Sequence, residues 1–373
     1  MRKHSEIFNT NLIYFLIMAL FVVIRICTAM NVFSFLGKNE EIVLTLATQV
    51  GLMVILPFAL FSCFNKKSPK QTLQKFHVKP VGIKTILISI AIGVIVFLLN
   101  IAISSFFSYI LSLFGYVSGA SGVTTSASWS NFFTSLITVA VLPTICEEFT
   151  HRGMLLSSYK TLGLKKAVIL SGIMFGLIHL NVGQFFYASI IGMILAVITL
   201  YSNSIIPAVI VHFMNNAISL YLSFAQAKGI FGGNFYTIIS NYLSSGSLFA
   251  NLIFVILTLC LLVYLLFILI NMLLKINIKK TVQTYAQNVT LLAMREEVLR
   301  DINSTENNKK TIFPIAFSND VKQNPVSVKL PYEMLGFYME PVVKPSLLDK
   351  TFYWGSIVLG GLVTFFTFIW GIL

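Results

Sequence analysis

Residues 131–159, NFFTSLITVAVLPTICEEFTHRGMLLSSY, form an apolar stretch that contains two adjacent glutamates, Glu147 and Glu148. A helix of about 20 apolar residues crosses a bilayer, so this stretch is long enough to span a membrane. A carboxylate in hydrocarbon is costly unless it is paired or protonated, and an acid in such a place is a candidate functional residue. The other acidic residues lie near the N-terminus or in polar connections. This stretch is therefore expected both to span the membrane as a helix and to carry functional residues.

The composition extends this conclusion to the whole chain. Of the 373 residues, 57% are hydrophobic and only 10% are charged, whereas soluble domains carry about 25% charged residues. We therefore predict an all-α, polytopic bundle of transmembrane helices. The expected spans are nine apolar runs, at residues 11–36, 42–64, 84–115, 131–159, 166–181, 184–201, 204–224, 249–274 and 351–373.

The basic residues predict an orientation. If the N-terminus is cytoplasmic, all but three of the 26 Lys and Arg residues fall in cytoplasmic connections, the exceptions being Arg25, Lys38 and Lys228. Such asymmetry is the positive-inside signal of membrane proteins. The net charge of +13 is thus explained by topology, and it does not indicate nucleic acid as a partner. We expect a multi-pass protein of the plasma membrane, with the lipid bilayer as its surroundings.

The pattern divides the chain into five parts. Residues 1–130 are expected to form N-terminal transmembrane helices, of which the first is retained rather than cleaved because no small-residue cleavage site follows it. Residues 131–224 hold the polar residues of interest, and 225–280 an outer loop with the eighth span. Residues 281–350 form a polar cytoplasmic insertion, whose first part is a candidate amphipathic helix, and 351–373 a C-terminal span. The four cysteines are scattered through apolar sequence and predict no metal or redox motif.

Polar residues recur at helical spacing in three of the spans. Glu148 and Arg152 are four residues apart and share one face of a helix, as do His212 and Asn216 in a later span. His179 follows the pair Gly172-xxx-Gly176, a spacing that lets another helix approach closely.

The depths of these residues agree. Counted from the nearest lysine at the cytoplasmic end of each span, Glu147 and His179 both lie roughly 20 Å into the membrane at 1.5 Å per residue. Counted from Ser204, near the start of its span, His212 lies at roughly 12 Å and Asn216 at roughly 18 Å. Three helices thus place polar groups in a similar slab of the bilayer.

Two chemistries and one structural role fit this set. A buried glutamate can activate water for attack on a carbonyl, while a histidine and an asparagine bind the developing oxyanion. Alternatively, Glu147, His179 and His212 supply one carboxylate and two imidazoles, a possible zinc set, although no HExxH motif is present. Polar residues in membrane bundles also lock helices together without catalysis.

Taken together, the three motifs resemble a known family. The segments Glu147-Glu148-Phe149-Thr150-His151-Arg152, Phe175-Gly176-Leu177-Ile178-His179 and His212-Phe213-Met214-Asn215-Asn216 match the patterns EExxxR, FxxxH and HxxxN. These patterns, in this order, are similar to those of the CAAX protease and bacteriocin-processing (CPBP, or Abi) family of intramembrane proteases, which includes the type II CAAX prenyl endopeptidases. The resemblance covers about residues 130–224.

The resemblance implies roles for the matched residues. Glu147 is expected to activate water with help from His179, His212 and Asn216 to bind the oxyanion, and Glu148 and Arg152 to support them. It also implies a site that opens toward the cytoplasm. It leaves metal use open; we favour no cofactor, with zinc as the alternative, because no further ligand is evident.

The function expected from these observations is intramembrane hydrolysis of a membrane-associated peptide or protein, with or without a prenyl group. A non-catalytic immunity or signalling scaffold of the same fold is the alternative. A proton-coupled transporter is a third possibility. The sequence shows no evident inverted repeat, which argues against this possibility.

Overall fold

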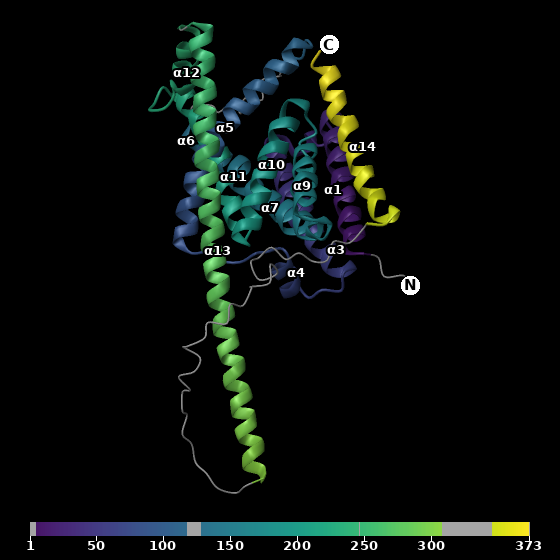
Figure 1. Ribbon diagram of the computed structural model, residues 1–373. Coiled ribbons are helices and arrows are strands. Elements are labelled where there is room, and N and C mark those ends of the chain that lie inside the picture. Colours follow the sequence, from purple (N-terminus) through teal and green to yellow (C-terminus); the bar gives the residue numbers. More distant parts are fainter. Residues whose placement is uncertain (1–4, 118–127, 246, 308–344, 373) are drawn as a thin grey trace.

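The computed structural model describes residues 5–117, 128–245, 247–307 and 345–372, and every regular element in these ranges is a helix. The predicted all-α bundle is therefore confirmed. Figure 1 shows the helices packed side by side, with α13 running along one flank and continuing well beyond one end of the bundle. The helices α1 and α14 lie together on the opposite flank.

Most helices follow the predicted spans. In chain order, the elements are α1 (Glu6–Ala29), η1 (Ser34–Asn39), α2 (Glu40–Thr45), η2 (Leu46–Ile55), α3 (Leu56–Phe64), α4 (Pro69–Lys75), α5 (Ile83–Leu113), α6 (Trp129–Ser135), η3 (Leu136–Val141), α7 (Leu142–Glu148), η4 (Phe149–Leu156), α8 (Ser157–Tyr159), η5 (Lys160–Leu162), α9 (Leu164–Leu177), α10 (Val182–Ser202), α11 (Ile206–Lys228), α12 (Phe235–Ser245), α13 (Leu248–Asn307) and α14 (Leu347–Trp370).

The number of long apolar helices is smaller than the nine spans predicted. Within the described ranges, eight helices are long and apolar enough to cross a membrane. The fifth predicted span, 166–181, forms α9, which has 14 residues. At 1.5 Å per residue α9 is roughly 21 Å long, shorter than the roughly 30 Å hydrocarbon core. The chain turns back into α10 before α9 could cross, and this turn carries His179.

The predicted cytoplasmic insertion is described only in part. Helix α13 runs without a break from the eighth span to Asn307, so the helix expected at the start of the insertion is a continuation of that span. The rest of the insertion, residues 308–344, lies outside the described residues, as do residues 118–127.

Glycines bring α9 and α10 into direct contact. A Cβ atom on Gly176 would lie 2.0 Å from Ser189 Oγ, and one on Gly172 would lie 2.4 Å from Met193 Cγ. These distances are far below van der Waals contact, so only glycine fits at either position. The close approach expected from the Gly172-xxx-Gly176 pair is thus made to α10, and it fixes the depth at which α9 ends.

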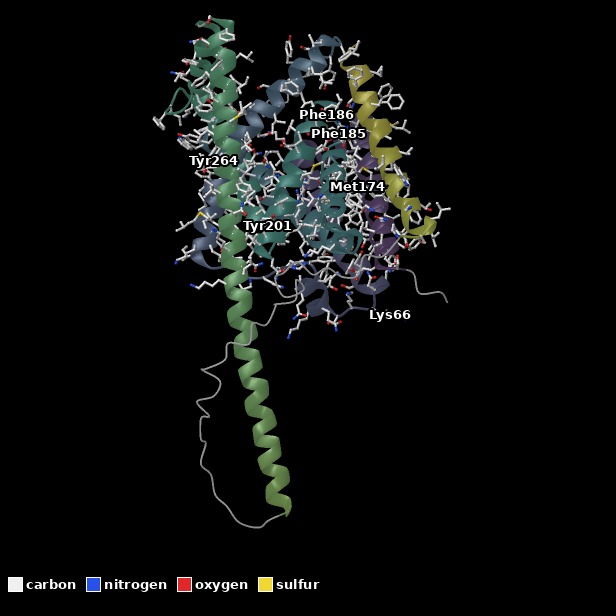
Figure 2. All side chains as sticks on the ribbon, viewed as in Figure 1. Lys66, Met174, Phe185, Phe186, Tyr201 and Tyr264 are labelled. Carbon is white, nitrogen blue, oxygen red and sulfur yellow. The ribbon has the colours of Figure 1, made fainter. Side chains whose placement is uncertain are left out.

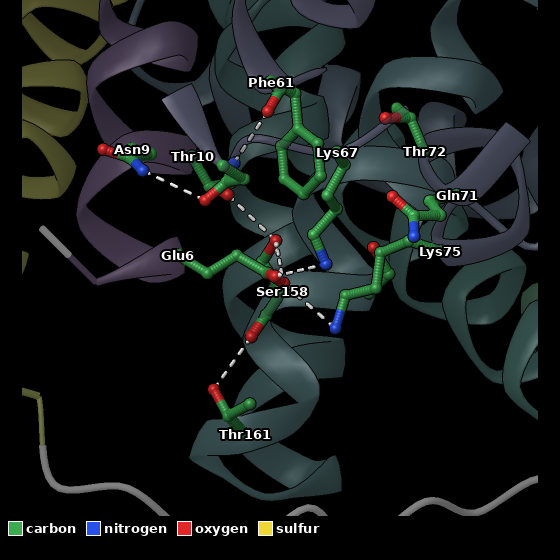
Figure 3. A network of polar contacts seen from close by, with 12 residues as sticks. Glu6, Asn9, Thr10, Phe61, Lys67, Gln71, Thr72, Lys75, Ser158 and Thr161 are labelled. Carbon is green, nitrogen blue, oxygen red and sulfur yellow. Dashed lines mark hydrogen bonds and ion pairs between the residues drawn. The ribbon is translucent and has the colours of Figure 1, made fainter. Parts of the chain in front are cut away.

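A polar network joins the helices at the end of the bundle where α1 begins (Figure 3). Glu6 forms ion pairs with Lys67 at 3.1 Å and Lys75 at 3.0 Å, and Thr10 donates a hydrogen bond to Ser158 at 2.9 Å. Since α1 begins at this end and α14 finishes at the other, the two ends of the chain lie on opposite faces (Figure 1). Which face is cytoplasmic stays a prediction.

Apolar side chains fill the space between the helices. Figure 2 shows Met174 in the middle of the bundle, Tyr264 on α13, and Lys66 at the end near α4. Met174 is buried, whereas Tyr264 is mostly exposed. The outer surface of α13 is apolar and exposed along most of its span, as expected of a helix that faces lipid.

Candidate functional site

The three predicted motifs meet around the ring of Phe175 on α9. The guanidinium carbon of Arg152 lies 4.4 Å from the centre of this ring. The rings of His179 and His212 lie 5.4 Å and 5.5 Å from it, both edge to face. The buried phenylalanine therefore separates and orients the polar side chains of three different segments, namely η4, the turn after α9, and α11.

Glu148 is the centre of a buried ion cluster. Its Oε1 accepts hydrogen bonds from Arg152 Nη1 at 3.0 Å and from His212 Nδ1 at 3.0 Å. Arg152 Nη2 donates to the carbonyl of Gly192 on α10 at 2.8 Å. Glu148 and Arg152 are fully buried, so this carboxylate ties α7, η4 and α11 together inside the bundle.

Glu147 points to a different environment. It lines a pocket of about 250 Å³ together with His179, Arg25, Gln49, Phe21, Ile24, Met53, Ile178 and Leu180. Gln49 Nε2 donates to Glu147 Oε1 at 3.3 Å, and Glu147 Oε2 has no hydrogen-bond partner among the described residues. The two adjacent glutamates thus serve separate surroundings, one a closed ion cluster and the other a pocket.

The turn that carries His179 is held on both sides. Leu180 has a positive φ of 50°, which is unusual for a bulky residue, and Asn181 caps α10 by accepting from the backbone N–H of Gly183 at 2.8 Å. Arg25 Nη1 donates to the carbonyl of His179 at 3.3 Å. This strained turn makes His179 a lining residue of the pocket that also contains Glu147.

Asn216 lies in a chain of amides that the sequence did not predict. Asn100 of α5 donates to Asn215 at 3.1 Å, and Asn215 donates to Asn216 Oδ1 at 3.1 Å. Asn216 Nδ2 in turn donates to the carbonyl of Val139 at 3.3 Å. Neither Asn216 nor His212 lines the pocket that holds Glu147 and His179, so the six predicted residues do not share one cavity.

His151 is a buried neighbour of Glu147 for which the motifs predict no role. Its Nδ1 donates to the backbone carbonyl of Glu147 at 2.8 Å, and its Nε2 lies 3.1 Å from the hydroxyl of Tyr14 on α1. That hydroxyl lies 2.8 Å from the carbonyl of Met174. His151 therefore connects the backbone of the pocket carboxylate to α1 and α9.

The possible zinc set does not converge in this structure. Among the described residues no group of three or more His, Cys, Asp or Glu side chains could hold a metal ion. His212 is not among the residues that line the pocket of Glu147 and His179, and its Nδ1 is bonded to Glu148. The three residues proposed as zinc ligands therefore do not form a metal site as they stand.

Two pocket residues, Arg25 and Gln49, were missed as site residues. A signal for each existed, because both are polar side chains within predicted apolar spans. No spacing linked them to the motifs, however, since they lie on α1 and η2, roughly a hundred residues earlier in the chain.

The fold and the pocket define a multi-pass integral membrane protein with a polar site inside its helical bundle. Residues 128–218 match the family model described as "Type II CAAX prenyl endopeptidase Rce1-like". This segment contains all three motifs, so the match confirms the resemblance: the segment is similar to a family of membrane proteases. The spans before and after it lie outside the match. No curated protein and no solved structure matched the chain.

Proposed function

We propose that this protein is an intramembrane endopeptidase in which Glu147 activates the attacking water. The observation that carries the proposal is the pocket, which Glu147 and His179 both line. A carboxylate can accept the proton of the attacking water and, as the acid so formed, give it to the leaving amine, while an imidazole orients the water. Gln49 holds one oxygen of the carboxylate and leaves the other for the water.

His212 and Asn216 are proposed to bind the oxyanion. Nδ1 of His212 is held by the carboxylate of Glu148 at 3.0 Å, so Nε2 is the ring nitrogen proposed to face the oxyanion. The amide of Asn216 has two N–H bonds and uses one on Val139. Since neither residue lines the pocket, the substrate carbonyl has to reach past Phe175 toward them. Hydrogen bonds that tighten only in the complex are common among catalytic residues.

The orientation affects how substrate enters. Arg25 follows Glu6 by nineteen residues on the unbroken helix α1, which is roughly 28 Å. The pocket therefore lies in the half of the bundle away from the lysine-rich connections. If those connections are cytoplasmic, as the positive-inside rule favours, the pocket belongs to the outer half, and the cytoplasmic opening implied by the resemblance lacks support. Labelling single cysteines introduced at Lys38 and Lys66 from either side of the membrane decides the orientation.

The substrate proposed is a membrane-associated peptide or protein, and prenylation belongs to this proposal only through the family. The test compares peptides released from membranes that carry the wild type, Glu147→Gln or Glu41→Gln. Glu41 is an exposed glutamate on α2, also in an adjacent pair, and is the matched control. We expect the wild type and Glu41→Gln to release the same peptides and Glu147→Gln to release none. Equal release by Glu147→Gln refutes the mechanism.

One observation favours the non-catalytic scaffold as second candidate. The cluster of Glu148, Arg152 and His212 is closed and buried, which is what helix packing alone would require. If the protein is such a scaffold, Glu147→Gln leaves its phenotype intact, whereas disruption of Glu148 abolishes the phenotype through loss of the fold.

Metal content measured on the purified protein, with activity before and after chelation, tests the preference for a metal-free site.

A further inference from the structure

Arg25 is a cation in the membrane-spanning part of α1 that belongs to none of the family motifs. It is exposed, it lines the pocket of Glu147, and it donates a hydrogen bond to the carbonyl of His179. It also lies outside residues 128–218, the matched segment. A charged side chain at membrane depth is costly and is usually retained for function.

The charge of Arg25 is not matched within the described part of the chain. Arg152, the other arginine at membrane depth, pairs with Glu148 at 3.0 Å. The ion pairs of the described residues include none made by Arg25. An arginine near a helix end can snorkel to water, but the bond to His179 directs this guanidinium to the rim of the pocket. A carboxylate is the natural partner for its remaining donors.

The two charged residues of the pocket differ in their exposure to solvent. Arg25 is exposed at its rim, whereas Glu147 is only 7% exposed and marks its buried end. The volume of about 250 Å³ is just below the range of about 300–1,000 Å³ for pockets that hold drug-sized ligands. A peptide that fills it therefore brings only a residue or two beyond the carbonyl near Glu147. Its negative group has to follow that carbonyl closely in order to reach Arg25.

The remaining polar atoms suit a peptide as well. Gln49 Oε1 and Glu147 Oε2 are buried acceptors without a partner among the described residues. Such groups are uncommon in native structures and need a donor, which a peptide N–H or a water in the pocket can provide. The pocket therefore offers acceptors for N–H groups and one cation for a carboxylate.

We propose that Arg25 is a specificity-determining residue that binds a carboxylate of the substrate within about two residues of the scissile bond. The carboxylate comes either from a free C-terminus or from an Asp or Glu side chain. This inference rests on the proposed function, because it assumes that Glu147 marks the reacting carbonyl. It assigns a selective role to α1, which the family segment does not contain.

The test measures binding, so that it does not depend on hydrolysis. The full-length Glu147→Gln variant in nanodiscs is titrated with a library of N-acylated apolar tetrapeptides in three forms: with a free C-terminal carboxylate, with a C-terminal amide, and with the amide plus one aspartate. Each titration is repeated after adding Arg25→Met, Arg25→Lys or Lys38→Met. Lys38 is an exposed cation on η1 outside the pocket and is the matched control.

We expect Arg25→Met to weaken binding of a carboxylate-bearing form about ten- to a hundredfold, the value of one charge-assisted contact. Arg25→Lys is expected to lose less, and Lys38→Met nothing. If only the first form binds, the carboxylate is terminal; if the third form also binds, a side chain suffices. Equal binding of amide and carboxylate forms, an equal loss for all three forms in Arg25→Met, or no binding by any form overturns the proposal.

Failure of the proposed function has a different signature. A protein that is no protease, but has an anion-selective pocket, still discriminates the peptide forms through Arg25 while releasing no peptides from membranes. Conversely, a protease whose Arg25 only supports the turn at His179 releases peptides, and its Arg25→Met variant loses carboxylate and amide forms alike.

Discussion

Glu148 is predicted to determine stability, whereas its neighbour Glu147 is predicted to determine activity. Replacing Glu148 by Leu removes the acceptor of two hydrogen bonds of 3.0 Å, from Arg152 and from His212. Both donors stay buried, and Arg152 is left as an uncompensated charge with no exposed surface. Breaking a buried ion pair by deleting one partner costs about 3–5 kcal/mol. We expect a loss of this size in the free energy of unfolding.

Glu147→Gln is the matched comparison one residue away. It removes a charge that receives a single hydrogen bond of 3.3 Å from Gln49, and glutamine keeps an acceptor at the same place. The loss in stability is therefore expected to be about 1 kcal/mol or less. Unfolding of both variants in detergent, followed by intrinsic fluorescence against temperature and denaturant, measures the difference, while peptide release measures activity.

The double variant Glu148→Leu/Arg152→Met separates the charge effect from packing. Removing both partners leaves no buried charge, and replacing a buried pair by apolar groups is often close to neutral. We expect the double variant to be more stable than Glu148→Leu alone. A Glu148→Leu variant as stable as the wild type, or a double variant less stable than the single one, refutes the assignment of Glu148 to a structural ion cluster.

Two further predictions concern the surroundings of the site. Burial, with the positive charges of Lys160, Lys79 and Lys75, holds the pKa of His77 well below its ordinary value of 6.5. Below pH 6.5 the unfolded chain gains a proton that the folded chain does not. The free energy of unfolding therefore decreases by up to about 1.4 kcal/mol for each unit by which the pH is lowered. His77→Asn, which tolerates the left-handed backbone there, should remove this component from melting curves between pH 5 and 8. Gly176→Val should destabilise the protein by at least about 1–3 kcal/mol, because its Cβ would lie 2.0 Å from Ser189 Oγ. The control Gly361→Val should not destabilise it, since no atom lies within 4 Å of a Cβ there. Equal unfolding midpoints for the two glycine variants contradict the close packing of α9 on α10.

The sequence predicted the helical class because membrane physics leaves few alternatives. Long apolar runs have to form helices in a bilayer, and their lengths can be counted. It predicted 166–181 as a full membrane span, the fifth of nine, because composition does not show where a helix ends. The chain turns at Leu180, in the left-handed region, and no turn residue such as glycine or asparagine occupies that position.

The division of labour between Glu147 and Glu148 was only partly accessible from the sequence. Spacing correctly paired Glu148 with Arg152, since residues four apart share a face. The partner that completes the cluster, His212, lies 64 residues later, and its choice of Glu148 depends on how α11 packs on α7. The pocket itself depends on α1 and η2, whose side chains reach Glu147 only through tertiary packing.

Three π-helical segments surround the site, and each supplies one of its contacts. Gln49 on η2 donates to Glu147, Val139 on η3 accepts from Asn216, and Arg152 on η4 pairs with Glu148. A π-helix has wider turns than an α-helix, is rare, and is frequently found at functional sites. Because an apolar run with α-helical spacing does not reveal such a turn, the sequence predicts straight spans here. Simple locking of helices would be achieved by regular α-helices, so three local departures that all converge on the predicted residues favour a catalytic rather than a packing role.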